Sequence, residues 1–380
     1  RKPQSALLVA KPKDPEVERL WCDIAVWVDS QGLSIVLEPE LFRTIRGEGP
    51  PESTPAAPKL MKVCWCDSDC SCARLSSSSK PSDPPVKQLA WDREGKLPPG
   101  FLNRCRTWTP GQDKLERAID IVICIGGDGT LCWAAGLFSG AMPPVIAFAG
   151  GSLGFLTPFP MRDWMAVLAP LLGANCEVSQ SLPMTCRMRF QMRVLRGAAH
   201  SDDSSEAECK VPPIPVQALN EVLVHRGSSG SLVKLEVGVN QSQVTLVQGD
   251  GLILATPTGS TAYSLAAGGS MMHPALPGII MTPVCPHSLS FRPVVLPDSA
   301  VVIVGVPLSA RSSVLVAVDG KDRIELQQGD SIEVSVSPYP LPTICKTSVT
   351  DDWFFSLKSA LQWNLRLEQK GLNQTSGTPP

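Results

Sequence analysis

The 380-residue sequence lacks two features that would point to a particular kind of macromolecular partner. Its 34 Lys and Arg nearly balance 36 Asp and Glu, for a formal charge of −2 and a pI near 6.2, so it has no excess of positive charge to attract nucleic acid or an anionic membrane. No apolar run approaches the roughly 18 residues needed to span a bilayer; VVIVGVPL at 301–308 is among the longest. We therefore expect a soluble globular protein with no nucleic-acid and no membrane partner.

Two standard nucleotide-binding fingerprints are also missing. The chain has no GxxxxGK[ST], and no GxGxxG that opens a helix after a strand, the two patterns that cradle phosphates in the commonest nucleotide folds. A phosphate site must therefore be argued from other residues.

The cysteines are not arranged as a disulfide framework. Thirteen is an odd number, and they are scattered through apparent strands and helices, which favours reduced thiols in an intracellular compartment. Four of them lie together as Cys64, Cys66, Cys70 and Cys72. Structural zinc sites usually pair C-x2-C knuckles, so we favour a loop with free thiols and assign no metal ligand, with zinc as the alternative. The chain begins at Arg1 rather than Met, so we expect a cytosolic location and leave a mitochondrial one open.

The stretch AIDIVICIGGDGT, residues 118–130, carries the strongest signal. Its Ile- and Val-rich run predicts a buried parallel strand, and the carboxyl end of such a strand is where ligands bind. The loop that follows contains Gly126, Gly127, Asp128, Gly129 and Thr130. The glycines allow a sharp turn close to a ligand, the aspartate supplies a carboxylate, and the threonine can cap the next helix, whose N–H groups suit phosphate. An ordinary strand-to-helix turn is the plainer alternative.

The surrounding residues predict a doubly wound α/β domain over 1–180. SALLVA and LSIVLEP are typical of strands on either side of an amphipathic helix that begins at Pro15 and ends at Gly32, which makes a βαβ unit. From 46 to 112 the composition is rich in Pro and Ser and has no sustained period, which predicts a disordered insertion. PVIAF is another buried strand, and the GGSLGF turn after it carries Phe155, which either packs in the core or stacks on a base.

The rest of the chain predicts a β-rich, sandwich-like domain over 181–340. Short alternating strands begin at MTCRMRFQMRVL and recur to SIEVSVS, with Asp319-Gly320 as a hairpin signal. Arg187, Arg189 and Arg193 of the first stretch and Arg196 directly after it would alternate along a single strand. Their alternation favours a solvated face over a substrate contact. A helix at 351–369 has an apolar stripe that needs a surface to cover it, and we expect the segment 341–380 to return to the α/β domain.

Two groups of polar residues stand out in the β-rich half. Asn220 and Glu221 interrupt the apolar VQALNEVLV; burying them is costly unless they are hydrogen-bonded, so either a ligand with hydroxyl groups meets them or the strand enters from a wet loop. The segment GDGLILATPTGSTAYSLAAGG predicts a strand, a hydroxyl-rich loop and a helix. Its polar and loop residues include Asp250, Thr258, Ser260, Thr261 and Tyr263. Hydroxyls and N–H groups at a helix start bind phosphate and ribose well, although Ser and Thr are also good caps.

Taken together, GGDGT, GSLGF, LNE and DGLILATPTGSTAYSLAAGG closely resemble the motifs of the NAD kinase family. The likeness extends through HPALPGIIMTPVCPHSLSFRPVVLP and DDWFFSL, and the eukaryotic, animal cytosolic branch looks nearest. The resemblance implies ATP-dependent phosphorylation of the 2′-hydroxyl on the adenosine ribose of NAD, with a divalent metal such as Mg²⁺, and a homo-oligomer. Two alternatives stay open: a dinucleotide-binding paralogue without turnover, and a lipid or sugar kinase that shares GGDGT alone.

The same resemblance implies roles for single residues. Asp128 would be the general base. Gly126, Gly127 and Thr130 would face ATP phosphates. The residues implied to contact NAD are Gly129, Phe155, Asn220, Glu221, Asp250, Thr258, Thr261, Ala262 and Tyr263.

Overall fold

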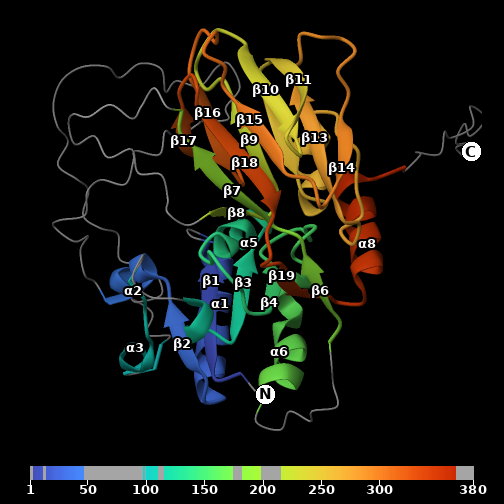
Figure 1. Cartoon of the computed structure of the whole chain (residues 1–380). Coiled ribbons are helices and arrows are strands. Elements are labelled where there is room, and N and C mark those ends of the chain that lie inside the picture. Colours follow the sequence, from blue (N-terminus) through green and yellow to red (C-terminus); the bar gives the residue numbers. More distant parts are fainter. Residues whose placement is uncertain are drawn as a thin grey trace, which may run out of the picture.

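A computed structural model describes residues 3–11, 14–46, 97–98, 100–109, 115–173, 182–197 and 215–364. Figure 1 shows two regions, an α/β domain below and a β-rich domain above. The predicted combination of an α/β domain with a β-rich, sandwich-like domain is confirmed. Within the described residues, no helix is long and apolar enough to cross a bilayer.

The α/β domain is built on a seven-stranded sheet. Its helices are α1 (Pro15–Ser30), α2 (Pro39–Arg46), α3 (Phe101–Arg104), α4 (Leu115–Ala118), α5 (Asp128–Ala135) and α6 (Trp164–Leu172). Its strands are β1 (Ser5–Ala10), β2 (Ser34–Leu37), β3 (Ile121–Gly126), β4 (Val145–Ala149), β5 (Phe159–Pro160), β6 (Met184–Arg187) and β19 (Leu341–Ile344). The order is β2-β1-β3-β4-β19-β6, with β5 also on β4. All of these pairs are parallel except β19 with β6.

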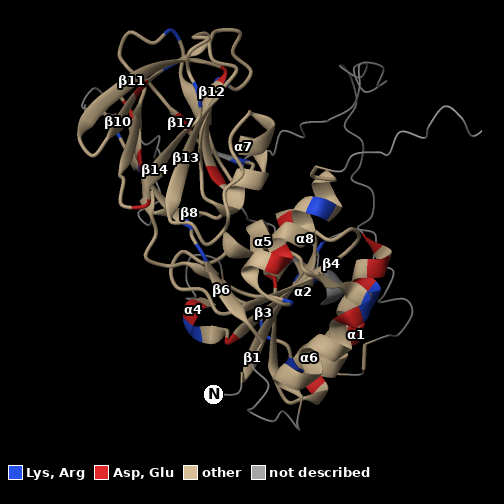
Figure 2. Ribbon diagram, turned by 90° about the vertical axis from the view of Figure 1, so that its right-hand side faces the viewer, with Lys and Arg blue, Asp and Glu red and all other residues tan. Residues whose placement is uncertain are grey.

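Helix α1 shows how the sequence specifies this layer. Asp14 is its N-cap and accepts a hydrogen bond from the Val17 N–H, and Pro15 lies in the first turn, where its missing N–H costs nothing. Buried residues recur at helical spacing along one side of α1, while Figure 2 shows charges of both signs on the helix. Such a stripe drives the helix onto the sheet.

The β-rich domain consists of two six-stranded sheets that share one apolar core. The first has the order β11-β10-β15-β18-β7-β8 and the second β14-β13-β12-β9-β16-β17. The strands of the first are β7 (Phe190–Leu195), β8 (Val216–Ala218), β10 (Val233–Val239), β11 (Ser242–Gly249), β15 (Val302–Gly305) and β18 (Ser331–Val336). Those of the second are β9 (Glu221–His225), β12 (Gly251–Ala255), β13 (Gly278–Val284), β14 (Val294–Pro297), β16 (Val314–Val318) and β17 (Lys321–Leu326).

The expectation of one strand across MTCRMRFQMRVL is wrong. β6 pairs with β19 in the α/β sheet, whereas β7 pairs with β18 in the β-rich domain, so the chain changes domain at residues 188–189. Arg187 and Arg189 are buried at this crossing. The predicted solvated face is therefore wrong for these two arginines, because their guanidinium groups donate hydrogen bonds to oxygen atoms inside the protein.

Part of the predicted insertion at 46–112 is ordered. Residues 101–104 form α3, Phe101 and Trp108 are buried, and the Arg106 backbone N–H donates to the Ile35 carbonyl beside β2. The search for sequence periodicity did not detect this ordered part, because a few large buried side chains hold it in place and it has no amphipathic repeat. The Cys64–Cys72 cluster lies outside the described residues.

The C-terminal segment returns to the α/β sheet through β19, as predicted. It ends in α8 (Val349–Leu361), which lies beside the sandwich in Figure 1. Leu357 is buried and the Trp353 ring lies 5.2 Å from that of His273, but Phe354 and Leu361 are 39% and 42% exposed. The expectation that the whole stripe is covered is therefore wrong for this single chain, because α8 meets its neighbours over only a narrow contact.

Candidate active site

Asp128 is the first residue of α5 and is held by the glycine-rich loop after β4. Its Oδ2 accepts a hydrogen bond from the Phe155 N–H at 2.9 Å, and Oδ1 accepts one from the Leu156 N–H at 3.0 Å. The Thr157 hydroxyl donates to Oδ1 at 3.4 Å. Backbone donors on both oxygens fix the carboxylate plane, so Asp128 is oriented before any ligand arrives.

Glycines allow the backbone to lie close to the side chains of Asp128 and Thr130. A Cβ on Gly154 would lie 2.1 Å from Asp128 Oδ1, and one on Gly126 would lie 2.4 Å from Thr130 Oγ1. Thr130 is therefore packed against the strand end within the first turn of α5. The N-cap of α5 is Gly127, without a side-chain cap, so the expectation that Thr130 caps the helix is wrong.

The buried Arg187 and helix α8 both donate hydrogen bonds to the glycine-rich loop that holds Asp128. Arg187 donates from Nη2 to the Phe155 carbonyl at 3.5 Å and from Nε to Thr343 Oγ1 at 3.2 Å. Burial lowers the pKa of this guanidinium, and the nearby Cys345 and Asp128 oppose that shift. The Ser356 hydroxyl of α8 donates to the Gly154 carbonyl at 2.9 Å. Chain segments distant from Asp128 in sequence thus set its position.

Asn220 and Glu221 lie where the chain passes from β8 in one sheet to β9 in the other. The predicted single strand VQALNEVLV is therefore split at Leu219–Asn220. Asp319 holds this turn: its carboxylate accepts the N–H groups of Leu219 at 2.8 Å, Asn220 at 2.7 Å and Glu221 at 3.2 Å. Asn220 is half-buried and Glu221 is buried. The alternative in which both side chains remain exposed to solvent is therefore wrong for Glu221.

Glu221 is an unusual carboxyl group. Burial raises its pKa to about 7, with a further contribution from the charge of Asp319. Its Oε2 is buried and has no hydrogen-bond partner within the described chain. A buried acceptor that receives no hydrogen bond lowers the stability of the fold unless a ligand donates one to it.

The hydroxyl-rich loop packs directly on the Asn220 turn. Thr256 donates from Oγ1 to the Leu219 carbonyl at 2.6 Å and from its backbone N to the Asn220 carbonyl at 2.9 Å. A Cβ on Gly259 would lie 2.0 Å from Asn220 O. Ser260 is bonded to Pro257 and Met272, and Ser264 to Thr282. Structural roles thus explain more of these hydroxyls than expected from the sequence, whereas Thr258 Oγ1 is buried without a partner among the described residues.

The two halves of the site meet at Cys132, one turn along α5 from Asp128. The Asn220 side-chain amide donates to Cys132 Sγ at 3.4 Å. Burial, and then the carboxylates of Asp319, Asp128 and Glu221, raise the pKa of the Cys132 thiol. Acidic groups of both domains therefore lie near enough to Cys132 to act on its thiol.

The structure gathers most, but not all, of the predicted residues. Phe155 is bonded to Asp128, and Asn220 contacts Cys132 one turn along α5 from Asp128. Gly129 lines the same pocket as Cys132 and Asp319, and Gly259, next to Thr258, packs on Asn220. Thr261 is the last residue of the short helix Thr258–Thr261, and Ala262 follows it. Tyr263 begins α7 (Tyr263–Ala266) and is 42% exposed.

Asp250 stands apart from the Asn220 turn. It precedes the five-residue strand β12 while Thr256 follows it, which puts about 17 Å between the strand ends. Its carboxylate is paired with Arg226, Oδ1 to Nε at 2.8 Å. Asp250 comes nearer to Tyr263, whose pKa is raised by burial, then by Cys285 and by Asp250.

Two contributors were missed from the sequence. Asp319 was noted only as part of a hairpin turn, and Cys132 was not singled out. An acidic residue beside a turn glycine is common, and its partners lie about 100 residues away in sequence, so no local pattern could have revealed the role.

Comparison with known proteins agrees with this geometry. The models of the ATP-NAD kinase N-terminal and C-terminal domains match residues 66–174 and 219–345. The chain belongs to the NAD kinase family. The family matches therefore contain both Asp128 and the turn at Asn220.

Individual relatives support the assignment. The chain is 45% identical to a probable NAD kinase 1 of Oryza sativa over 271 residues, 71% of this chain and 48% of the relative. It is 41% identical to the NAD(+) kinase of Saccharomyces cerevisiae over 252 residues, 66% of this chain and 46% of that protein. Among solved structures, yeast NADH kinase complexed with NADH superposes with a TM-score of 0.70 at 26% identity, covering 97% of this chain and 91% of that one. The chain spans about half the length of these rice and yeast sequence relatives.

Proposed function

We propose that the protein transfers the γ-phosphoryl group of ATP to the 2′-hydroxyl of the adenosine ribose of NAD, giving NADP and ADP. The observation that carries this proposal is the Asp128 carboxylate, oriented by two backbone N–H groups at the start of α5, one turn from the contact between Cys132 and Asn220. A carboxylate oxygen has two lone pairs, and the Phe155 N–H uses one of those on Oδ2. The other can receive the hydroxyl proton as the new O–P bond forms and the bond to ADP breaks.

The remaining residues serve binding and alignment in this proposal. The Asn220 amide and the buried Glu221 carboxyl face the ribose, where hydroxyl groups satisfy the open valence of Glu221 Oε2. The first N–H groups of α5 lack partners within the helix and carry its positive dipole end, which suits the phosphates of ATP. Phosphoryl transfer depends mainly on such positioning and charge neutralisation.

The acidic groups around Cys132 fit a divalent ion that arrives with ATP. Within the described chain, no group of three or more His, Cys, Asp or Glu is arranged to hold a metal by itself. Mg²⁺ is usually held by one or two carboxylates together with substrate phosphates, and Asp128 is the carboxylate that would face it. When bound, the ion would neutralise charge on the transferring phosphoryl group.

A coupled assay for NADP formation from ATP and NAD tests the proposal. Wild-type protein should form NADP, and Asp128→Asn should lower turnover by about 100-fold or more. Because the side-chain amide introduced by this substitution has only one oxygen for two N–H donors, we expect stability to fall by about 0.5–1.5 kcal/mol with the fold retained. A folded wild-type protein that binds NAD without turnover would favour the inactive paralogue, and activity on lipid or sugar alone would favour the other kinase classes.

The finer assignments rest on the resemblance. Running the assay with NADH as well as NAD tests the acceptor, and Mg²⁺ titration tests the metal. Light scattering of the purified protein tests the proposed homo-oligomer, for which the exposed strand edges and the apolar residues of α8 offer surfaces. An animal, cytosolic type stays a prediction.

A further inference from the structure

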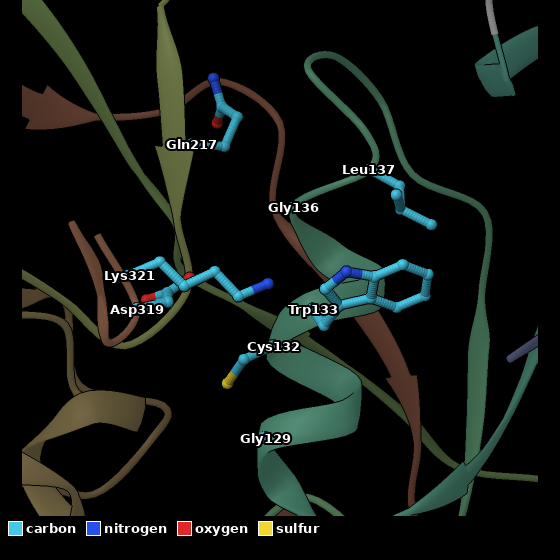
Figure 3. A pocket seen from close by; sticks show the side chains of 8 residues that line it. All are labelled: Gly129, Cys132, Trp133, Gly136, Leu137, Gln217, Asp319 and Lys321. Carbon is cyan, nitrogen blue, oxygen red and sulfur yellow. The ribbon is translucent and has the colours of Figure 1, made fainter. Parts of the chain in front are cut away.

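A pocket of about 150 Å³ lies between α5 and the β-rich domain. Helix α5 and the turn after it contribute Gly129, Cys132, Trp133, Gly136 and Leu137, and the β-rich domain contributes Gln217, Asp319 and Lys321 (Figure 3). The α5 positions recur at spacings of three and four, which places them on one side of the helix. The pocket therefore begins beside the catalytic loop and runs along α5 away from it.

The walls change in character along this path. Near Gly129 they are polar, with Asp319 and Lys321, and further on they are formed by the Trp133 ring, Leu137 and Gln217. Lys321 Nζ lies 6.0 Å from the centroid of the Trp133 ring, and Figure 3 shows this side chain reaching toward the indole. The Asp319 carboxylate accepts three backbone N–H groups, so these donors balance part of its charge.

Gln217 supplies the second indication that the pocket binds a ligand. It is 8% exposed, yet its Oε1 is buried without a hydrogen-bond partner within the described residues. At the end of the pocket formed by Trp133 and Leu137, a buried amide of this kind can bind the edge of a planar ligand, and Gln suits the donor and acceptor pattern of adenine. The Trp133 ring offers a stacking surface for such a base.

The geometry points to this pocket as the site for the base of the phosphoryl donor, an adenine nucleotide. The inference rests on the proposed function, which puts the γ-phosphate beside Asp128. Gly129 and Leu137 are eight residues apart, about 12 Å along a helix, and a triphosphate with its ribose separates γ-phosphorus and base by a comparable length. Lys321 then lies between the two, where the bridging phosphates pass, and the base meets Trp133 and Gln217.

Steady-state kinetics of Gln217→Glu and Trp133→Leu test this assignment. Each substitution should raise KM for ATP about tenfold, because each removes one contact to the base, while KM for NAD stays within about twofold. The preference for ATP over GTP, measured as the ratio of kcat/KM values, should persist in Gln217→Glu, since the carboxylate still accepts from adenine N6, whereas guanine presents only the acceptors O6 and N7 on that edge.

Gln243→Glu is the matched control. It makes the same change on β11, at the opposite edge of the sheet that contains Gln217, and should leave all constants at wild-type values. Thermal melting identifies any variant that does not fold, and Trp133→Met, which also lacks a ring, then replaces Trp133→Leu. If KM for ATP is unchanged, or if KM for ATP and NAD rise together, the pocket does not hold the donor base. Absence of NADP formation by the wild type would instead overturn the proposed function itself.

Discussion

Glu221 is a carboxyl group that the fold keeps away from water. Its pKa is raised to about 7, first by burial and then by the charge of Asp319, so the folded protein binds this proton more tightly than the unfolded chain does. The stability linked to the group is therefore fully present below its ordinary value of 4.5 and is lost as the pH rises through about 7. A neutral Glu221 can also donate a hydrogen bond, which an ionised one cannot.

Glu221→Gln should flatten the pH dependence of stability. Between pH 4.5 and 7 the wild type should lose up to about 1.4 kcal/mol of unfolding free energy per pH unit relative to the variant. Urea denaturation at a series of pH values measures the difference. Glu236→Gln, on an exposed position of β10, should follow the wild-type profile. Parallel profiles for wild type and Glu221→Gln would show that Glu221 is ionised in the fold.

At the scale of elements, the site depends on two turns that carry little sequence signal. The strand β3 and the loop to α5 were predictable, because an apolar run followed by glycines and an acidic residue is typical of a buried strand that ends in a ligand-binding loop. The separation of β8 from β9 was not, since VQALNEVLV is apolar enough for one strand, and the change of sheet is set by Asp319 and Thr256 from distant parts of the chain. The prediction for Arg187 was wrong for the same reason: alternation cannot distinguish a solvent-exposed face from a buried one, where the Thr343 hydroxyl and the Phe155 carbonyl accept from this side chain.

Gly154→Ala tests whether the glycine-rich loop positions Asp128. The added Cβ would lie 2.1 Å from Asp128 Oδ1, so the loop or the carboxylate must move. Turnover should fall about tenfold or more while the melting temperature changes little, because a misaligned base costs rate. The control is Gly151→Ala in the same loop, where a Cβ has no neighbour within 4 Å. Equal activity of the two variants would remove the loop from the catalytic alignment.

At the scale of the whole molecule, two crossings between the domains lie within the described residues, at Met188–Arg189 and before β19. Arg189 is fully buried at the first crossing. It donates to carbonyls that end α5 or follow it, Ala135, Phe138 and Gly140, and to Tyr339 of the second crossing. Burial lowers the pKa of this guanidinium to about 10, so it remains charged at neutral pH. One side chain thus ties α5, which carries Asp128, to both connections.

Replacing Arg189 by Met should loosen the two domains from each other. Four carbonyls lose a charged donor, so we expect a loss of about 3 kcal/mol in unfolding free energy. All nine tryptophans lie outside residues 190–336, so tryptophan fluorescence reports on the rest of the chain, whereas far-UV circular dichroism also reports the β-rich domain. The two transitions should coincide in the wild type and separate in Arg189→Met, because two-state unfolding requires the domains to unfold together. Arg193→Met, at an exposed position of β7, should keep a single transition. Coincident transitions in Arg189→Met at wild-type stability would show that other contacts join the domains.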